Sequence, residues 1–484
     1  MLLTQTFVDR ISAALPAGAL LTEPEDLRTY ECDGLTGRRV LPALVCLPET
    51  TGQVQAVVRA CSAFGAPFVA RGAGTGLSGG ALPVAEGIVI SLARMNRVLS
   101  VDPDSQRIVV QPGVTNLQVS EAVVAEGLHY APDPSSQQVC TIGGNVAENS
   151  GGAHCLKHGF TVNHVTGLTV VLPDGEVARL GGFGLDSPGP DVLGVFVGSE
   201  GTLGIATEIT LRLLRRPGAV VTQLAAFDST DQAGAAVSDI VAARILPAAI
   251  EMMDRLTIEA AEAAVHAGYP SAGAILIVEL DGVPDQVDED LSALDRICRE
   301  RGAFEIRTAA DAAERALLWK GRKSAFGAMG RVSQSYYVQD GVVPRTKLPE
   351  VLRRIAELER EYGLRVGNVF HAGDGNLHPL VLYDEHAPGE ADRARELADA
   401  ILVACIDAGG SLTGEHGVGT DKACAMPLMF GEADLEVMRR LRSAFDPAGL
   451  ANPGKVFPTP RLCGEVPGPY RRHPLEKAGL AERF

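Results

Sequence analysis

The sequence predicts an α+β protein in which a glycine-rich N-terminal domain is followed by a domain of alternating helices and strands. The chain has 484 residues, more than one compact core usually holds. Its 54 glycines are clustered, most densely in three segments before residue 217. From residue 217 onward the glycine density falls, and apolar residues recur with helical and strand periods.

Composition and charge exclude several classes of function. The formal net charge of −17 disfavours nucleic acid or an anionic membrane surface as the main partner. The N-terminal residues 1–15 have the pattern of an amphipathic surface helix, and no apolar run reaches the ~18 residues that span a bilayer. The nine cysteines form no C-x-x-C pair, which predicts reduced, mostly buried thiols and no iron–sulfur cluster. We therefore expect a soluble, cytoplasmic protein.

The segment 70–81, ARGAGTGLSGGA, contains the G-x-G-x-x-G pattern of dinucleotide-binding turns. A Rossmann turn requires a strand before the glycines and a helix directly after them. Strands are predicted at 42–48 and 67–70, but a proline and the β-rich run 87–92 follow the glycines and leave no room for a helix. We interpret the segment as a loop between strands whose backbone N–H groups hold phosphate, with Arg71 at its mouth.

The rest of the first domain contains two more glycine-rich segments. Strands, a helix and a hairpin are predicted around them, at 105–114, 116–127, 167–180 and 205–214. Between the helix and the hairpin, residues 131–159 are rich in Gly, Ser, Asn and Pro and predict a long functional loop. One large phosphate-bearing cofactor, extended across 71–80, 141–152 and 198–204, would explain all three glycine-rich segments.

The second domain is predicted to be a sheet with helices on one face. Its predicted strands are 219–227, 274–281, 332–343, 366–371 and 377–383. Its predicted helices are 231–244, 285–301, 346–362 and 390–408.

A polar cluster is predicted late in this domain. His371 and His378 flank a glycine-rich turn, and the adjacent Glu415 and His416 lie in a second glycine-rich loop. Two histidines and one carboxylate on short loops suit a divalent metal with open coordination positions. Each histidine taken alone is also explained as an ordinary satisfied polar residue.

A basic group precedes this cluster. Lys320, Arg322 and Lys323 are predicted at the start of a helix in an acidic protein. A solvated basic face explains the two lysines. Arg322 is the candidate for binding a substrate carboxylate, because a guanidinium group can hold both of its oxygens.

The glycine-rich segments RGAGTGLSGG, PDPSSQQVCTIGGNVAENSGG and GSEGTLGI resemble, in this order, the flavin domain of the vanillyl-alcohol oxidase/PCMH flavoprotein superfamily. The later segments, with LWKGRKSAFGAMGRVSQSYYVQDGVVPR, resemble its FAD-linked 2-hydroxy-acid dehydrogenases. This group includes D-lactate and D-2-hydroxyglutarate dehydrogenases and the catalytic FAD subunit of bacterial glycolate oxidase, to which the likeness is greatest. The resemblance implies a two-lobed PCMH-type FAD-binding domain at 1–216 and an α+β cap domain with an antiparallel sheet at 217–440. A C-terminal segment, 441–484, would return to the flavin.

The resemblance also implies roles for individual residues. His371, His378 and Glu415 would hold a divalent metal (Zn, Mn or Fe), His416 would be the base, and Arg322 would bind the substrate carboxylate. Relatives with covalent flavin often carry His where this chain has Thr75, so we expect non-covalent FAD. Where relatives usually have Tyr, His158 would alter a flavin contact or have no effect. The FAD-binding residues would be Arg71, Gly72, Ala73, Gly74, Thr75, Gly76, Leu77, Ser78, Gly79, Gly80, Pro132, Asp133, Ser136, Thr141, Gly143, Gly144, Asn145, Asn149, Gly152, Gly159, Glu200, Gly201, Gly204, Ile205 and Asn452.

The implied activity is oxidation of a small 2-hydroxy acid, glycolate and/or D-lactate, to the 2-oxo acid by hydride transfer to FAD. Because the chain has no cluster motif of its own, an iron–sulfur subunit and a second FAD-binding subunit are the implied partners, through which it would lie peripheral to the inner membrane. One alternative is a stand-alone D-lactate or D-2-hydroxyglutarate dehydrogenase. Two others are a non-catalytic flavin-carrying subunit and a nicotinamide-dependent Rossmann enzyme.

Overall fold

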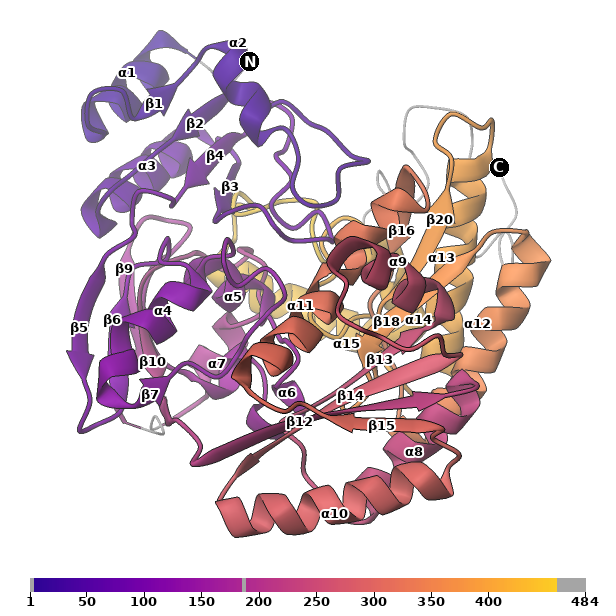
Figure 1. The fold of residues 1–484 in the computed structure, drawn as a ribbon. Coiled ribbons are helices and arrows are strands. Elements are labelled where there is room, and N and C mark those ends of the chain that lie inside the picture. Colours follow the sequence, from indigo (N-terminus) through magenta and orange to yellow (C-terminus); the bar gives the residue numbers. More distant parts are fainter. Residues whose placement is uncertain (1–3, 185–188, 459–484) are drawn as a thin grey trace.

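The computed structural model describes residues 4–184 and 189–458 of the chain. The first 216 residues form two lobes, and the following residues form a larger α+β unit beside them (Figure 1). We call this larger unit the cap. The C-terminal segment, yellow in Figure 1, passes back from the cap to the first lobes.

The first lobe is a four-stranded sheet with helices packed against it. Helix α3 (Thr51–Phe64) begins after Thr50, whose hydroxyl accepts the N–H of Gln53, and ends at the left-handed Gly65. Its apolar residues pack on the sheet together with α1 (Gln5–Ala14); α2 (Pro24–Leu27) follows α1. The strands, in spatial order, are β1 (Leu20–Leu21), β2 (Leu44–Cys46), β4 (Ile88–Ser91) and β3 (Phe68–Arg71). Strands β3 and β4 are parallel, and residues 72–87 join them without a helix, as the sequence predicts.

The second lobe is built on an antiparallel sheet. In spatial order its strands are β5 (Val98–Asp102), β6 (Arg107–Val110), β10 (Ile205–Arg212), β8 (Val165–Val171) and β9 (Val177–Gly181). The predicted hairpin is β8 and β9. The helices are α4 (Asn116–Val123), α5 (Ile142–Glu148), α6 (Cys155–His158) and α7 (Val192–Phe196), and β7 (Leu128–His129) pairs with β11 (Leu214–Arg215).

The prediction of one continuous loop at 131–159 is wrong. Helix α5 begins after Thr141, whose hydroxyl accepts the N–H of Gly144 at 3.4 Å. Two glycines in its first turn weaken the helical pattern in the sequence, but Ile142 and Val146 are fully buried in the core of the second lobe. Tertiary packing therefore stabilises a helix that the local sequence disfavours.

The cap contains one large antiparallel sheet. In spatial order its strands are β15 (Glu305–Thr308), β12 (Ala219–Phe227), β14 (Ala274–Gly282), β13 (Ala249–Asp254), β18 (Val366–His371), β19 (Asn376–Leu377) and β17 (Gly341–Val342). Strand β20 (Pro379–Tyr383) pairs with β18 and with β16 (Ser335–Val338).

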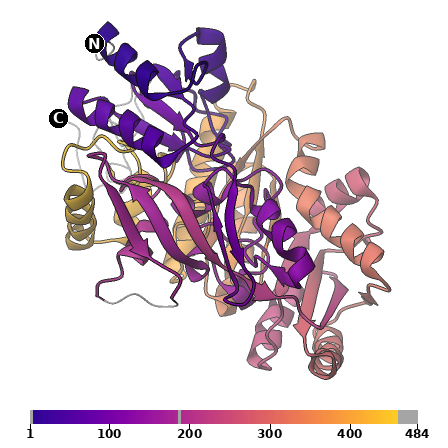
Figure 2. The ribbon, with the colours of Figure 1, turned by 90° about the vertical axis from the view of Figure 1, so that its left-hand side faces the viewer.

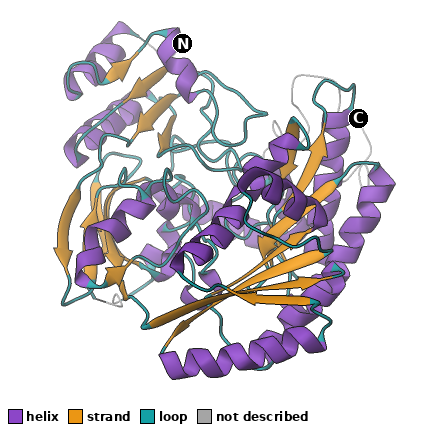
Figure 3. Cartoon of the chain, viewed as in Figure 1, coloured by secondary structure: helices purple, strands orange, loops and turns teal. Residues whose placement is uncertain are grey.

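Helices cover both faces of this sheet, so the prediction of helices on one face is wrong (Figure 3). Along β12, Ala225 and Phe227 belong to one core cluster, whereas Leu224 and Ala226 belong to another on the opposite face. The first cluster contains α8 (Thr230–Ala242), α10 (Pro284–Glu300), α12 (Leu348–Tyr362) and α13 (Glu390–Asp407). The second contains α9 (Arg255–Val265) and α11 (Ala312–Ala328).

The sequence predictions missed parts of this sheet and of the helices on its second face. Strands β13 and β15 and helix α9 were not predicted. Lys320, Arg322 and Lys323 lie within α11 rather than at its start. Strand β13 is buried on both faces and lacks the alternating polar pattern that marks a half-exposed strand.

The chain returns to the first lobe after α14 (Met426–Met429) and α15 (Glu432–Phe445). The N–H of Asn452 donates to the carbonyl of Phe68 at 2.8 Å, and Leu450 and Ala451 belong to the core of the first lobe. In Figure 2 this segment lies against the N-terminal half. The predicted boundary between residues 440 and 441 falls inside α15, and the division into three parts stays a prediction. Residues 459–484 lie outside the described residues.

Within the described ranges, no helix is long and apolar enough to span a membrane.

The cysteines follow the sequence prediction with one exception. Seven are free thiols, six of them buried and Cys32 half-buried. The prediction of a reduced thiol is wrong for Cys424, which is disulfide-bonded. Cys463 lies outside the described residues.

Candidate active site

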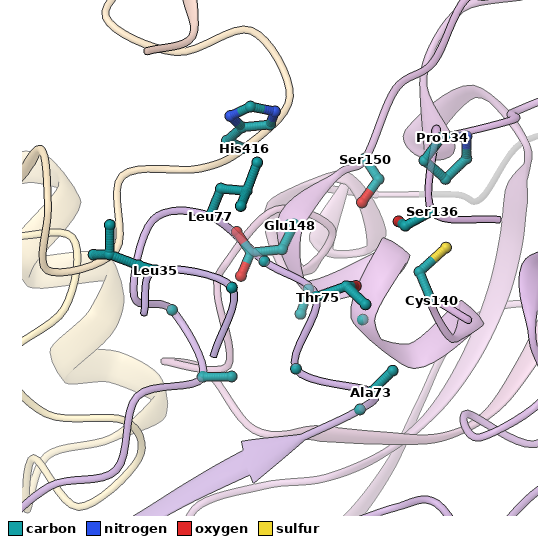
Figure 4. A pocket seen from close by; sticks show the side chains of 18 of the residues that line it. Leu35, Ala73, Thr75, Leu77, Pro134, Ser136, Cys140, Glu148, Ser150 and His416 are labelled. Carbon is teal, nitrogen blue, oxygen red and sulfur yellow. The ribbon is translucent and has the colours of Figure 1, made fainter. Parts of the chain in front are cut away.

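A cavity of about 1060 Å³ lies between the two lobes and the cap (Figure 4). All three glycine-rich segments contribute to its wall, together with residues of the cap such as Phe326 and Tyr336. The predicted site residues that line it are Arg71, Gly72, Ala73, Gly74, Thr75, Gly76, Leu77, Gly80, Ser136, Thr141, Gly143, Gly144, Asn145, Glu200, Gly201, Gly204, Ile205, His378, Glu415 and His416.

The loop after β3 has no room for side chains at two of its glycines. A Cβ on Gly72 would overlap the hydroxyl of Thr141, which caps α5. Gly74 has a φ of +72°, and a Cβ there would overlap the guanidinium group of Arg71. The backbone of this loop therefore forms the cavity wall, with the buried Arg71 as its cation. Exposed backbone N–H groups and one cation are donors that fit a pyrophosphate.

Eight predicted cofactor residues lie outside the cavity wall, and several of them hold other segments in place. The carbonyl of Ser78 accepts the N–H groups of Thr420 and Asp421. The amide of Asn452 donates to the carbonyls of Gly80 and Glu200 at 2.9 and 2.6 Å. The other residues outside the wall are Gly79, Pro132, Asp133, Asn149, Gly152 and Gly159. Their contact with a cofactor stays a prediction.

His154 links the second lobe to the cap. Its ring nitrogens lie 2.9 Å from a carboxylate oxygen of Asp133 and 3.1 Å from one of Glu279 on β14. The indole N–H of Trp319 donates to the other oxygen of Glu279 at 2.7 Å. Burial alone would lower the pKa of His154, but the two carboxylates raise it to about 10. His158 lies nearby, 3.9 Å from Asp281, and is outside the cavity wall.

The predicted metal ligands lie together at the cap end of the cavity. His371 ends β18, His378 precedes β20, and Glu415 lies in the loop 411–422, which we call the His416 loop. The Nε2 atoms of the two histidines each lie 3.3 Å from Oε1 of Glu415. The Nδ1 of His371 is 2.7 Å from Glu251, so a carboxylate fixes the orientation of this ring.

This cluster fits a divalent cation. One donor atom from each of His371, His378 and Glu415 lies within 4.8 Å of the others. Nδ1 of the buried His378 lacks a hydrogen-bond partner in the described part of the chain. Two imidazoles and a carboxylate that is buried yet ionised form a donor set for Zn, Mn or Fe. The metal itself stays a prediction.

Asp340 anchors the His416 loop. It is fully buried, and its Oδ2 accepts the N–H groups of Gly414 and His416 at 3.0 Å and the hydroxyl of Thr413 at 2.5 Å. Burial opposes ionisation, but Lys422 and the facing histidines hold the pKa of Asp340 well below its usual range. Asp340, His378 and His416 form a second group with metal-ligand spacing.

His416 lines the cavity, and its ring stacks on that of His378 with the centroids 4.9 Å apart. Burial lowers the pKa of His416 to about 4, with the nearby carboxylates only partly opposing it. The ring is therefore neutral near pH 7 and able to accept a proton.

Arg322 is buried and does not line the cavity. Its Nη2 forms an ion pair with Glu251 at 2.5 Å, and Glu251 contacts His371 in turn. Its Nε has no hydrogen-bond partner in the described structure. Its predicted role as the carboxylate-binding residue stays a prediction.

Sequence reasoning missed Asp340, Glu251 and Glu148. Asp340 lies inside the predicted strand 332–343. This prediction is wrong, because the structure has two short strands there, β16 and β17, with Asp340 between them. Glu251 lies in β13, which the sequence does not predict. A single acidic residue inside an apolar run indicates a buried carboxylate, which needs partners, and this pattern could have identified Glu251. Glu148 lies in a segment whose predicted role rests on its glycines, so the sequence analysis assigns this carboxyl group no function.

Comparison with known proteins agrees with this geometry. Residues 42–181 match the family model for the FAD binding domain, and residues 216–456 match that for the C-terminal domain of FAD linked oxidases. The chain is 49% identical to glycolate oxidase subunit GlcD of Escherichia coli (strain K12) over 484 residues, covering 99% of this chain and 97% of that protein.

The chain belongs to the FAD-linked oxidase family.

The family membership confirms FAD as the cofactor and overturns the nicotinamide-dependent alternative. The chain is also 32% identical to a D-lactate dehydrogenase of Anaerostipes hadrus over 425 residues, covering 86% of this chain and 89% of that protein. The structure of p-cresol methylhydroxylase superposes with a TM-score of 0.77 at 20% identity, covering 93% of this chain and 96% of that chain. The predicted PCMH-type α+β fold is thereby confirmed.

Proposed function

We propose that this FAD-linked oxidase oxidises a small 2-hydroxy acid, glycolate and/or D-lactate, to the 2-oxo acid. The observation that carries the proposal is that the three glycine-rich segments line the same cavity as His378, Glu415 and His416. The relatives named glycolate oxidase subunit and D-lactate dehydrogenase support the substrate class.

Side chains in the cavity wall and directly behind it divide the chemistry among them. FAD, when bound, would supply the hydride acceptor, and a divalent cation, which His371, His378 and Glu415 would hold, would supply Lewis acidity toward the substrate hydroxyl. The neutral His416 accepts the hydroxyl proton at Nε2, the nitrogen that lies 3.9 Å from Glu415. Arg322 lies outside the cavity wall and pairs with Glu251; it is proposed to bind the substrate carboxylate, for which a guanidinium group is suited. Holding these groups in line is the contribution of the protein.

The first experiment mixes the purified FAD-loaded chain anaerobically with glycolate, D-lactate, L-lactate and D-2-hydroxyglutarate. Rapid bleaching of the visible flavin band by glycolate or D-lactate is the expected result. A yellow protein that none of the four acids bleaches, alone or with its partner subunits, would overturn the substrate class. Removal of divalent metal by a chelator is expected to prevent bleaching, with Zn²⁺, Mn²⁺ or Fe²⁺ restoring it.

We also propose that the chain works in a multi-subunit glycolate oxidase, with an iron–sulfur subunit and a second FAD-binding subunit, through which it lies peripheral to the inner membrane. The name of the Escherichia coli relative supports a subunit role. Affinity purification from the native cell is expected to retain an iron–sulfur protein. A monomer that passes its electrons directly to a small quinone would instead favour the stand-alone D-lactate dehydrogenase.

A further inference from the structure

Phe326 lies in the cavity wall beside the candidate metal ligands, and no step of the proposed reaction uses it. The centroid of its ring lies 5.8 Å from that of His378, with the two ring planes tilted by 55°. His378 in turn stacks on His416. Phe326 is half-buried, so part of its ring is open to the cavity. The ring therefore borders the place where a substrate held by His378 and His416 would lie.

Helix α11 sets the position of this ring. Phe326 follows Arg322, the residue proposed to bind the substrate carboxylate, by four positions, so the two lie on the same side of the helix. The hydroxyl of Tyr269 donates to the carbonyl of Leu318 at 2.5 Å, and a Cβ on Gly321 would overlap that hydroxyl. The backbone of α11 is thus fixed against the core of the cap, and the ring cannot yield by a shift of its helix.

Two further apolar side chains continue the wall beside Phe326. In β16, Tyr336 and Val338 alternate with Ser335 and Tyr337, so they point to one face of the strand. Tyr336 and Val338 pack against the same core cluster as Phe326, and all three line the cavity. We call these three residues the apolar wall. Phe326 is the member of the apolar wall whose ring contacts a candidate metal ligand.

The apolar wall selects by both size and charge. One methylene too many in a hydrophobic pocket lowers kcat/KM by about 10–200-fold. A carboxylate on the substituent would lose its hydration against the three side chains. The closest cation along α11, Lys323, is paired with Asp133 at 3.5 Å. A small, uncharged substituent is therefore the one that fits beside Phe326.

We propose that Phe326 determines the substrate specificity of this enzyme, because its ring limits the substituent on C2 of the 2-hydroxy acid to hydrogen or a methyl group. The inference rests on the proposed function, which places the substrate between His378, His416 and Arg322. It adds the residue that separates glycolate and D-lactate from longer 2-hydroxy acids.

The test compares wild type with Phe326→Ala and Phe326→Leu, all loaded with FAD. Anaerobic reduction of the flavin gives a second-order rate constant for glycolate, D-lactate, D-2-hydroxybutyrate and D-2-hydroxyisocaproate. In wild type the constant for D-2-hydroxyisocaproate should lie at least about tenfold below that for D-lactate. In Phe326→Ala the ratio of the D-2-hydroxyisocaproate constant to the glycolate constant should rise by about 10–200-fold. Phe304→Ala is the control, because Phe304 is exposed and lies outside the cavity wall.

A binding measurement checks the same point without turnover. Pyruvate and 2-oxoisocaproate are titrated into the oxidised proteins, and the change in the flavin absorbance gives their dissociation constants. Phe326→Ala should bind 2-oxoisocaproate more tightly relative to pyruvate, by the same factor of about 10–200. Phe326→Leu should change both ratios in the same direction by a smaller factor.

Three results would overturn the inference and leave the proposed function standing. The first is a wild-type protein that D-2-hydroxyisocaproate or D-2-hydroxyglutarate reduces as fast as D-lactate does. The second is an unchanged ratio in Phe326→Ala, even if all rates fall together, because that would show a structural role alone. The third applies if Phe326→Ala does not retain FAD: an unchanged ratio of D-2-hydroxybutyrate to glycolate in Phe326→Leu. A wild-type protein that none of these acids reduces would overturn the proposed function, and the inference with it.

Discussion

The two ends of the active-site cavity differ in what lines them: backbone at the end of the glycine-rich segments, and side chains at the end of His416. At the cofactor end the wall is mostly backbone, and glycines leave room for it. At the reaction end the wall is side chains: His378, Glu415 and the stacked His416, with His371 behind them and buried carboxylates in support. Adding atoms therefore damages the cofactor end, whereas removing atoms damages the reaction end. Variants at the two ends should therefore separate binding of FAD from its reduction.

The largest expected effect is at the reaction end. Replacing His416 by Ala removes the proposed base and should slow reduction of the flavin by substrate by about 10²–10⁴-fold, the usual range for a lost general base. FAD should stay bound, because His416 belongs to the reaction end of the wall. Stopped-flow absorbance measures the rate, with the exposed His386→Ala as control. A normal rate in the His416 variant would remove the base assignment.

At the cofactor end, Gly74→Ala should weaken FAD binding by about 1–3 kcal/mol, the cost of a lost hydrogen bond to a charged group. The new Cβ overlaps the guanidinium group of Arg71 and displaces this cation from the cavity wall. The left-handed backbone costs alanine about 1–2 kcal/mol of folding stability, with or without FAD. Titration of the apoprotein with FAD measures the affinity. Gly52→Ala is the control, because Gly52 lies in α3 and its Cβ would meet nothing closer than 4.0 Å. Once the Gly74 variant is saturated with FAD, substrate should reduce its flavin at close to the normal rate. A loss of rate as large as that of His416→Ala would contradict the separation of FAD binding from FAD reduction.

Asp340→Asn sharpens the contrast within the reaction end. An asparagine side chain has one acceptor oxygen, so the N–H groups of the His416 loop lose part of their anchor. Such a change behind a ligand loop is expected to lower the maximal rate and the metal affinity by about 10–100-fold. Steady-state kinetics and metal analysis check both quantities, with the exposed Asp288→Asn as control. Unchanged metal content together with an unchanged rate would show that the loop holds its shape without Asp340.

The smallest expected effect concerns the link between the two parts. The pKa of His154 is raised from 6.5 to about 10 in the folded protein. The charged ring therefore stabilises the fold fully below about pH 6.5, and this contribution is lost as the pH rises through 10. At pH 6 the free energy of unfolding of His154→Gln should be about 1.5–3 kcal/mol lower than that of wild type. Near pH 10 this difference should vanish. Urea unfolding at the two pH values measures it, and a difference independent of pH would contradict the charged state.

More of the cofactor end of the cavity than of the reaction end could be predicted from the sequence. Pro83 and the predicted strand at 87–92 leave no room for a helix after the glycine-rich segment 70–81, and the structure confirms that no helix follows this segment. Helix α5 could not be predicted, because Gly143 and Gly144 hide a pattern that only burial in the second lobe supports.

At the reaction end, His371, His378, Glu415 and His416 were found from their neighbours in sequence, and the structure brings them together. The carboxylates that hold these residues in place, Asp340 and Glu251, could not be predicted from the sequence. Asp340 is 75 residues from Glu415 and Glu251 is 120 from His371, and no local pattern reports such pairings. They became visible only with the register of β13 against β18, which aligns Glu251 with His371.

The contact between Trp319 and Glu279 gives the molecule a built-in optical reporter. Trp319 is the only tryptophan of the chain, its indole lies 5.7 Å from the ring of His154, and its N–H is bonded to the residue that joins the cap to the flavin lobes. Its emission therefore comes from a single place in the protein, at the seam between the two halves. Any loosening of that seam, whether by temperature, by loss of FAD or by a docking subunit, would be read from the colour and intensity of one fluorophore without a label.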